Sequence, residues 1–375
     1  MYPITMKTKQ IFKSVFPGKY IQGEGLLDEI PALLHTFGDK PLIISSPTAK
    51  KKVLTDVAEN YQKRGIVMEE FKGECCEKEL QRIEKIAIAN ANNVIAGIGG
   101  GKTIDTAKII ADRMEIPVLI FPTIASTDAP CSGCAVIYSE EGIFESVYYQ
   151  KMNPQVVLMD VRIIADSPVR FLVSGMGDAL ATWFEARSCL RTKSMNACGG
   201  YSTIAGEAIA KQCYKTLLKY GTAAKMACEN HIITPALHAI VEANTLLSGI
   251  GFESAGLATA HSIHNGLSLL EEVHSFYHGE KVAFGVLTGL HLTGARPEEM
   301  ETVYGFCEAI NLPTTFAALG ITEVNREKLL KAATKACEPQ EGIHHEAENI
   351  TPEKVMFAMR AADAMGKNRK KAGKH

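Results

Sequence analysis

The first part of the chain alternates short apolar runs with stretches in which apolar residues recur at helical spacing. The runs that favour buried strands occupy residues 41–46, 66–68, 116–121 and 156–160. Helical spacing follows in residues 50–64 and 79–91. Strands that alternate with helices are typical of a parallel sheet covered by helices. The pattern therefore predicts an α/β unit with a Rossmann-like parallel sheet.

After about Arg162 the strand pattern disappears and long segments rich in Ala and Leu carry helical spacing. These segments cover residues 175–190, 202–220, 235–247 and 326 to the end. We therefore expect an α/β domain over residues 1–165 and an all-α domain over residues 166–375. No low-complexity linker separates the two, so they should pack closely, and clefts between domains are favoured ligand sites.

The most informative stretch runs from Asn93 to Asp128. An apolar run ends in four closely spaced glycines, Gly97, Gly99, Gly100 and Gly101, and helical spacing begins directly afterwards. Glycines let the backbone approach a phosphate closely, and the free N–H groups of a helix start attract negative charge. This order of strand, glycine turn and helix predicts a phosphate cradle, although a tight turn without a ligand is the simpler alternative.

Two standard phosphate motifs fail here by one residue each. The Walker A pattern would need Gly at Ala96, and the G-x-G-x-x-G pattern would need Gly at Lys102. The kind of nucleotide therefore stays open. A P-loop nucleotide hydrolase is a remote alternative, in which Asp160, at the end of an apolar run, would serve as the Walker B acid.

Composition narrows the class of protein. The 375 residues carry 40 basic and 42 acidic side chains, a net charge of −2, which gives no reason to expect nucleic-acid or membrane binding. We see no signal-peptide pattern and no apolar run of the ~18 residues that span a bilayer. With ten cysteines, we expect a cytoplasmic protein with reduced thiols. Cys131-x-x-Cys134 has the spacing of a redox motif, but no second pair completes a zinc site.

Histidines and one aspartate suggest a metal site. His261 and His264 are spaced i, i+3 and so share one helical face, and His278 precedes Gly279-Glu280, which suggests a turn or a helix start. Asp178 falls near the beginning of a predicted helix, where an N-terminal cap is the alternative role. Histidine with carboxylate suits Zn²⁺ or Fe²⁺, and three protein ligands with one open position are typical of catalytic zinc.

Five stretches together carry a family resemblance: GIGGGKTIDTAK, FPTIASTDAPCS, GMGDALATWFEA, GFESAGLATAHSIHNGL and HGEKVAFGVLT. They are spread over residues 97–288 and resemble the glycerol dehydrogenase branch of the iron-containing alcohol dehydrogenase superfamily. The resemblance implies a dinucleotide-binding α/β domain, a metal-binding helical domain and assembly into a homo-oligomer.

The resemblance also implies the metal ligands, which would be Asp178, His261 and His278. Many iron-dependent relatives have a further histidine four residues after the aspartate, where this chain has Thr182. That difference favours the zinc-type branch, with Fe²⁺ as the alternative metal.

For the dinucleotide, the resemblance implies contacts at the glycine turn and at the loops after it. The pyrophosphate would lie on Gly99, Gly100, Gly101, Lys102 and Thr103. The nicotinamide end would be lined by Thr123, Ser126, Ser132, Cys134 and Tyr138. Ser46 and Asp105 are further candidate cofactor residues.

One departure from the family bears on the choice of dinucleotide. NAD-dependent members usually carry an aspartate after the second strand, which binds the ribose 2′-hydroxyl. Here the strand ends in Ser45-Ser46-Pro47, and Lys50-Lys51-Lys52 follow. A carboxylate repels a 2′-phosphate, whereas serine and lysine accept one. We therefore predict that NADP is used at least as well as NAD; the alternative is that the lysines form a solvated helix face.

The implied reaction is metal-dependent, reversible oxidation of glycerol, or a similar small polyol, to the ketone, which for glycerol is dihydroxyacetone. Asp128 would contact the substrate hydroxyls, and His264 would relay the released proton. Gly133-Cys134-Ala135 and residues 338–349 look unusual for the family, so an NADP-dependent reductase of a small 2-oxo acid or hydroxyketone is the alternative. A catalytically inactive scaffold is a third possibility, which the intact metal-ligand set argues against.

Overall fold

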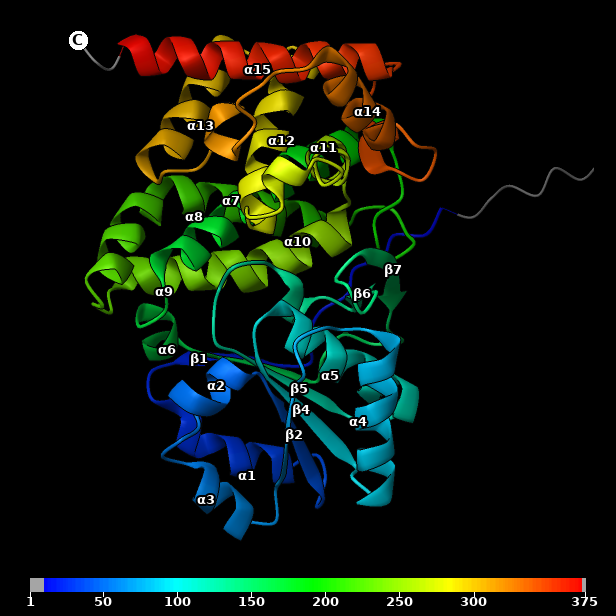
Figure 1. Cartoon of the computed structure of the whole chain (residues 1–375), viewed down its shortest axis with the longest axis vertical. Helices are drawn as coiled ribbons and strands as arrows, with labels where there is room; N and C mark the ends of the chain where they lie inside the picture. The colour runs from blue at the N-terminus through cyan, green and yellow to red at the C-terminus, as the bar shows by residue number, and fades with distance from the viewer. Residues whose placement is uncertain (1–9, 373–375) are drawn as a thin grey trace, which may run out of the picture.

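The computed structural model describes residues 10–372 and has two layers of different architecture (Figure 1). The lower one holds a parallel six-stranded sheet in the order β1-β8-β5-β4-β2-β3. Its strands are β1 (Tyr20–Gly23), β2 (Pro41–Ser45), β3 (Val67–Glu70), β4 (Val94–Gly99), β5 (Val118–Pro122) and β8 (Val156–Asp160). The predicted parallel sheet is confirmed.

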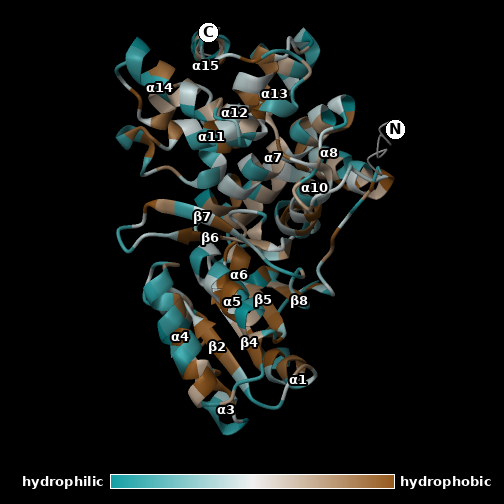
Figure 2. Ribbon diagram, turned by 90° about the vertical axis from the view of Figure 1, so that its right-hand side faces the viewer, coloured by the Kyte–Doolittle hydropathy of each residue, from teal (hydrophilic) through white to brown (hydrophobic). Residues whose placement is uncertain are grey.

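The apolar runs form the central strands because both faces of the sheet are covered. Every residue of β2, β4, β5 and β8 is buried. Alternate side chains point to opposite faces: Ile43 packs with α1 (Ile30–His35) and α3 (Ala58–Lys63), whereas Leu42 packs with α4 (Glu77–Ala89) and α5 (Gly101–Met114). Figure 2 shows the resulting colouring, with hydrophobic central strands and a hydrophilic outer face on α4. The short α2 (Pro47–Lys52) follows β2 directly.

A hairpin that the sequence pattern did not predict follows β5. It consists of the antiparallel strands β6 (Cys134–Tyr138) and β7 (Phe144–Tyr149) and lies beside the boundary between the two layers (Figure 1). Most of β7 is exposed. Because β7 has no buried face, its sequence does not need the apolar–polar alternation by which a half-buried strand is recognised.

The upper layer is helical. Its α-helices are α6 (Val161–Ala165), α7 (Val169–Thr192), α8 (Ile204–Glu229), α9 (Pro235–Glu242), α10 (Ser248–Ala255), α11 (Thr259–Leu267), α12 (His278–Leu292), α13 (Pro297–Ala309), α14 (Arg326–Ala336) and α15 (Pro352–Ala372). A π-helical turn, Ala243–Leu247, joins α9 to α10. Among the described residues, no strand follows Asp160, as the change of pattern near Arg162 predicts.

The long helix α7 crosses α12 at very short range. A Cβ added to Gly279 would lie 1.8 Å from the Ser174 carbonyl oxygen, and one added to Gly177 would lie 2.3 Å from the Gly279 carbonyl oxygen. Only hydrogen at these positions allows the two backbones to approach so closely. The crossing brings Asp178 of α7 next to the first turn of α12.

Residues 13–15, ahead of β1, lie against the helical layer. Lys13 N donates to the Tyr201 carbonyl at 3.1 Å, and Val15 N donates to Ser254 Oγ at 3.1 Å. In the part of the chain from residue 10 to residue 372, no helix is long and apolar enough to cross a membrane.

Candidate metal and dinucleotide site

The carboxyl ends of three neighbouring strands bring the predicted dinucleotide residues to one edge of the sheet. Ser46 N donates to the carbonyl of Ile98, and Thr123 N donates to the carbonyl of Gly99, both at 3.0 Å. Ser46, the glycine turn and Thr123 therefore lie side by side. Ligands of open parallel sheets bind at this edge.

The glycine turn leaves its backbone open on one side. A Cβ on Gly99 would lie 2.9 Å from Thr103 Oγ1 and 3.0 Å from Ser46 Oγ, so this position is closely packed. A Cβ on Gly101, the first residue of the 14-residue helix α5, would meet nothing within 4 Å. Space in front of a helix N-terminus suits a phosphate group.

Two predicted cofactor residues have partners within the protein. Lys102 Nζ pairs with Glu74 and lies 4.8 Å from the centre of the Tyr138 ring. Asp105 is buried and accepts a hydrogen bond from Val136 N at 3.0 Å. Burial raises the pKa of Asp105 to about 6, although Lys108 and the Val136 N–H act to lower it. Asp105 thus connects α5 to β6.

The lysine cluster after Ser46 faces a carboxylate that the sequence pattern did not identify. Lys50 Nζ lies 3.0 Å from Glu70 Oε2, and Lys72 Nζ lies 3.8 Å from Glu70 Oε1. Glu70 ends the edge strand β3 and is the register partner of Ser45 on β2. A carboxylate therefore stands one strand away from the position where the family aspartate is absent.

Three predicted metal ligands converge from three helices. His278 Nε2 lies 3.1 Å and His261 Nε2 lies 3.4 Å from Asp178 Oδ1. One candidate ligand atom from each residue lies within 4.8 Å of the others. Asp178 is buried, and its Oδ1 has no hydrogen-bond partner. A buried carboxylate oxygen without a donor, faced by two imidazole nitrogens, fits a divalent cation such as Zn²⁺.

Asp178 is not a helix cap, because α7 begins nine residues before it at Val169. The alternative capping role considered from the sequence is therefore wrong. Burial acts to raise the pKa of Asp178, but His278 and His261 outweigh it and hold that pKa well below its usual range. The carboxyl group is thus kept anionic, as a metal ligand must be.

Glu185 orients His261 and was missed by the sequence pattern. Its Oε2 lies 2.6 Å from His261 Nδ1, and its Oε1 accepts from the N–H groups of Ala258 and His261 at 2.9 and 3.0 Å. The signal in the sequence was its spacing, since Glu185 lies two helical turns after Asp178 on the same face of α7. A carboxylate on the far nitrogen of a ligating histidine fixes its tautomer and ring orientation.

His264 contacts the far nitrogen of His278, as Glu185 contacts the far nitrogen of His261. Its Nε2 lies 3.1 Å from His278 Nδ1, and its Nδ1 lies 3.1 Å from Asn265 Oδ1. Burial, together with the neighbouring His278 and Lys281, lowers the pKa of His264 well below its usual value. A neutral His264 accepts a hydrogen bond from His278 Nδ1–H and so fixes the orientation of that ring. Its role in proton relay stays a prediction.

Asp128 lies beside the metal cluster. Its backbone N donates to Asp178 Oδ2 at 3.2 Å, and Ser248 Oγ donates to its Oδ2 at 2.7 Å. Burial and the Asp178 charge raise the pKa of Asp128. Thr182, at the position of the additional histidine in iron-dependent relatives, shares a 2.8 Å hydrogen bond with Ser248 Oγ.

The remaining predicted residues follow Asp128 or precede it on the same loop. Ser132 and Cys134 both contact the buried Lys108, and the Ser126 carbonyl accepts from Ser174 Oγ at 3.2 Å. All ten cysteines are free thiols, so Cys131 and Cys134 form no disulfide.

The residue needed for the P-loop alternative has a structural task. The Asp160 carboxylate accepts from the N–H groups of Gly25, Leu26 and Arg162 at 2.7 to 3.1 Å. It therefore holds the loop after β1 and caps α6, which removes the Walker B candidate.

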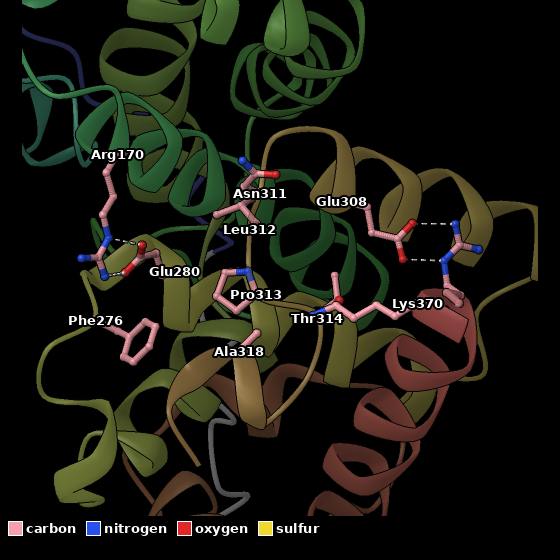
Figure 3. A pocket seen from close by; sticks show the side chains of 11 residues that line it. Arg170, Phe276, Glu280, Glu308, Asn311, Leu312, Pro313, Thr314, Ala318 and Lys370 are labelled. Carbon is pink, nitrogen blue, oxygen red and sulfur yellow. Dashed lines mark hydrogen bonds and ion pairs between the residues drawn. The ribbon is translucent and has the colours of Figure 1, made fainter. Parts of the chain in front are cut away.

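A cavity of about 600 Å³ lies beside the start of α12. In Figure 3 the side chains of Arg170 and Glu280 face each other across its wall, with Arg170 Nε 2.7 Å from Glu280 Oε1. Glu280 Oε2 also accepts from Tyr277 N at 2.7 Å and so caps α12. This ion pair therefore fixes the helix end that carries His278.

Comparison with known proteins adds independent information. The family profile described as iron-containing alcohol dehydrogenase matches residues 17–161. A glycerol dehydrogenase of Thermotoga maritima is 47% identical over 361 residues, which cover 96% of this chain and 99% of that protein. A glycolaldehyde reductase of Halobacterium salinarum is 40% identical over 359 residues, covering 95% and 98%.

A solved structure agrees with these sequence matches. The crystal structure of a probable glycerol dehydrogenase from Sinorhizobium meliloti superposes with a TM-score of 0.89 at 43% identity. The match covers 96% of this chain and 100% of that one. The similarity therefore extends over both the sheet and the helical layer.

Proposed function

This chain belongs to the iron-containing alcohol dehydrogenase family, and we propose that it oxidises glycerol reversibly to dihydroxyacetone with a nicotinamide dinucleotide. The members of that family are alcohol oxidoreductases. The observation that supports the proposal most directly is the cluster of Asp178, His261 and His278, in which a buried carboxylate oxygen lacks a hydrogen-bond donor.

The metal is proposed to be Zn²⁺, held by Asp178, His261 and His278. Bound Zn²⁺ supplies Lewis-acid polarisation of an alcohol oxygen, and the nicotinamide supplies the hydride acceptor. Fe²⁺ has the same preference for histidine and carboxylate and is the alternative. Thr182 stands where iron-dependent relatives have a further histidine, and its hydroxyl is hydrogen-bonded to Ser248. The absence of a histidine at this position favours the three-ligand zinc set.

The chain's own residues would then bind and orient the substrate. Asp128, next to the cluster, is proposed to hold a hydroxyl adjacent to the reacting carbon, which fixes its geometry. His264 is proposed to pass the released proton outward along its contact with Asn265. The overall change is alcohol to ketone, oxidised to reduced dinucleotide, and release of one proton.

The dinucleotide is proposed to lie along the carboxyl edge of the sheet. Its pyrophosphate would contact the turn of Gly99 to Thr103, and its nicotinamide would approach Thr123 and residues 126–138. Within this proposal, residues 1–165 bind the dinucleotide and residues 166–375 supply the metal ligands. A homo-oligomer is also proposed.

The preference for NADP is a proposal that one structural feature, the Glu70 carboxylate beside Lys50, opposes. Ser46 and the lysines favour a 2′-phosphate, whereas Glu70 pairs with Lys50 and reduces its positive charge. Measuring kcat/KM for NAD and for NADP, with wild-type protein and with Glu70→Gln, decides which dinucleotide is preferred. NADP use at least equal to NAD in wild type supports the proposal, and strong NAD preference contradicts it.

One observation favours a second class of substrate, a small hydroxyaldehyde or hydroxyketone. The relative from Halobacterium salinarum is described as a glycolaldehyde reductase. A small hydroxyaldehyde or hydroxyketone presents the same neighbouring hydroxyl to Asp128. Reduction of such a carbonyl is therefore the second candidate activity on the same site.

The test is dinucleotide reduction by glycerol at alkaline pH, before and after a chelator and after Zn²⁺ is restored. We expect turnover that the chelator abolishes and Zn²⁺ recovers, and no metal or turnover in Asp178→Ala. Dinucleotide binding without glycerol turnover, in a protein with full metal content, would contradict glycerol as substrate. Turnover and metal content unchanged in Asp178→Ala would contradict the ligand assignment.

A further inference from the structure

The segment from Asp128 to Cys134, called the 128–134 segment below, joins the two halves of the proposed site. It carries the proposed substrate contact Asp128 and two residues proposed to line the nicotinamide end, Ser132 and Cys134. Two buried charged side chains outside it, Lys108 and Glu253, bind its backbone from opposite sides. Neither has a role in the proposed reaction.

Lys108 closes the segment from the sheet side. Its side chain, on α5, is fully buried. Its Nζ donates to the carbonyls of Ala129 and Cys134 and to Ser132 Oγ, the last two at 2.9 and 3.4 Å. An ammonium group has three donors, and all three are used here. Because Ala129 and Cys134 stand near opposite ends of the segment, one nitrogen holds both ends together.

Glu253 holds the segment from the helical side. Its Oε1 accepts from Gly133 N at 2.9 Å, and its Oε2 accepts from Asn153 Nδ2 at 2.6 Å. Asn153 Nδ2 also donates to the Cys131 carbonyl at 3.0 Å. A Cβ on Gly133 would lie 3.1 Å from both Glu253 Oε1 and Asn153 Oδ1, so glycine lets this carboxylate approach the backbone.

The clamped segment is coupled to the metal ligands. Asp128 N donates to Asp178 Oδ2, which leaves Oδ1 to face His261 and His278. A shift of the segment would therefore move the Asp128 carboxylate relative to the cluster. Positioning within about an ångström decides whether a substrate group is held productively.

We infer that Lys108 and Glu253 are positioning residues that fix the 128–134 segment for substrate and nicotinamide binding. This inference rests on the proposed function, because it assigns the effect to Asp128, Ser132 and Cys134. Apolar side chains of similar volume often serve equally well in cores, so packing alone does not require these charges. Lys108 Nζ also lies 3.9 Å from Asp105 Oδ1, but its hydrogen bonds all go to the 128–134 segment.

The first test replaces Lys108 with Met, which keeps the unbranched side chain up to the position of Cε and removes the charged nitrogen with its donors. The matched control is Lys85→Met on the exposed face of α4. We expect Lys108→Met to raise KM for glycerol by about tenfold or more, with a smaller change in kcat, because uniform substrate binding is lost. The Kd of the dinucleotide, measured by calorimetry without substrate, should rise severalfold, and the Zn²⁺ content should equal that of the control.

The second test uses Glu253→Gln, which keeps an acceptor for Gly133 N but turns a donor toward the Asn153 amide. We expect a rise in KM of the same kind. Asn153 stays unchanged in this test, because its Nδ2 also donates to the Cys131 carbonyl of the segment. If Lys108→Met does not fold, Glu253→Gln decides the question.

The outcomes separate the inference from the function on which it rests. No glycerol turnover by wild type would defeat the proposed function first. Wild-type turnover with variants whose KM and dinucleotide Kd match the control, even at lowered Tm, would show a purely structural role and overturn the inference. A rise in KM and in dinucleotide Kd in both variants, at the Zn²⁺ content of the control, would support it.

Discussion

At the scale of single residues, the metal cluster depends on what binds the far side of each ligand. Glu185 takes the second nitrogen of His261, and His264 takes the second nitrogen of His278. Asp128 N takes the second oxygen of Asp178. Each ligand therefore presents one defined atom to the centre, which reduces the ordering that metal binding requires.

Replacing Glu185 with Gln should lower Zn²⁺ affinity by about 10–100-fold, because the charge that fixes the His261 tautomer is lost. Competition with a chromogenic chelator measures this affinity. Glu145→Gln, on exposed β7, is the control and should bind like wild type. Equal affinity in all three proteins would refute the orienting role of Glu185.

Asp105 should make stability depend on pH. Its pKa of about 6 in the folded state exceeds the ordinary value of about 3.9, so between these values the folded state holds a proton that the unfolded state releases. Stability therefore falls as pH rises through this window, by about 3 kcal/mol in total, and stays reduced above it. Asp105→Asn does not titrate.

Urea denaturation of wild type and Asp105→Asn from about pH 4 to 7 checks this slope. The difference between their unfolding free energies should change in favour of the variant as pH rises. Asp56→Asn at an exposed position is the control. A pH-independent difference between wild type and Asp105→Asn would show that the carboxyl group keeps an ordinary pKa.

At the scale of elements, the crossing of α7 and α12 sets the distance between Asp178 and His278. Gly177 and Gly279 leave no room for side chains there. Later on the same helix, a Cβ on Gly289 would lie 3.4 Å from Thr259 Cγ2, which is ordinary contact. Gly279 and Gly289 of α12 therefore differ in what alanine would do.

Gly279→Ala should lower the free energy of unfolding by about 1–3 kcal/mol or more, because backbone atoms must move apart. It should also weaken Zn²⁺ binding, since α12 carries His278. Gly289→Ala should be neutral or stabilise by up to about 1 kcal/mol through helix propensity. Thermal unfolding and metal titration of both variants test this contrast, and equal effects would refute it.

At the scale of the whole molecule, the proposed site needs both layers. The sheet and the loops after it contribute the glycine turn and the 128–134 segment, whereas α7, α11 and α12 contribute the proposed metal ligands. A metal that binds only this assembled geometry stabilises the folded state by mass action. At a free concentration of a thousand times Kd the gain is about 4 kcal/mol.

Removing Zn²⁺ with a chelator should therefore lower Tm, and restoring Zn²⁺ should recover it, at constant protein concentration. Asp178→Ala should show no such response, because the ligand that joins both histidines is missing. Scanning calorimetry at several Zn²⁺ concentrations measures this dependence. A Tm of wild type that does not respond to Zn²⁺ would contradict a specific site.

How much could be predicted from the sequence differs between features. The apolar runs at 41–46 and 116–121 identified β2 and β5, because a strand buried on both faces needs a continuous apolar run. The hairpin β6–β7 was missed since its second strand is exposed and has no buried face to set a pattern. Asp178 was placed too near a helix start because Ser167-Pro168, which mark the true start at Val169, were not recognised as a start signal.

The sequence by itself determined the order of α/β and helical parts and the glycine turn, and through family resemblance it predicted the residues of the proposed metal cluster. These follow from local spacing and from short motifs, which a linear chain displays directly. Only the tertiary structure decided that Glu185 serves His261, that Glu70 faces Lys50, and that Lys108 and Glu253 clamp the 128–134 segment. Such pairings join residues 20 to 120 positions apart. Several side chains of each type compete for them along the chain, and only packing brings one of these into hydrogen-bond distance.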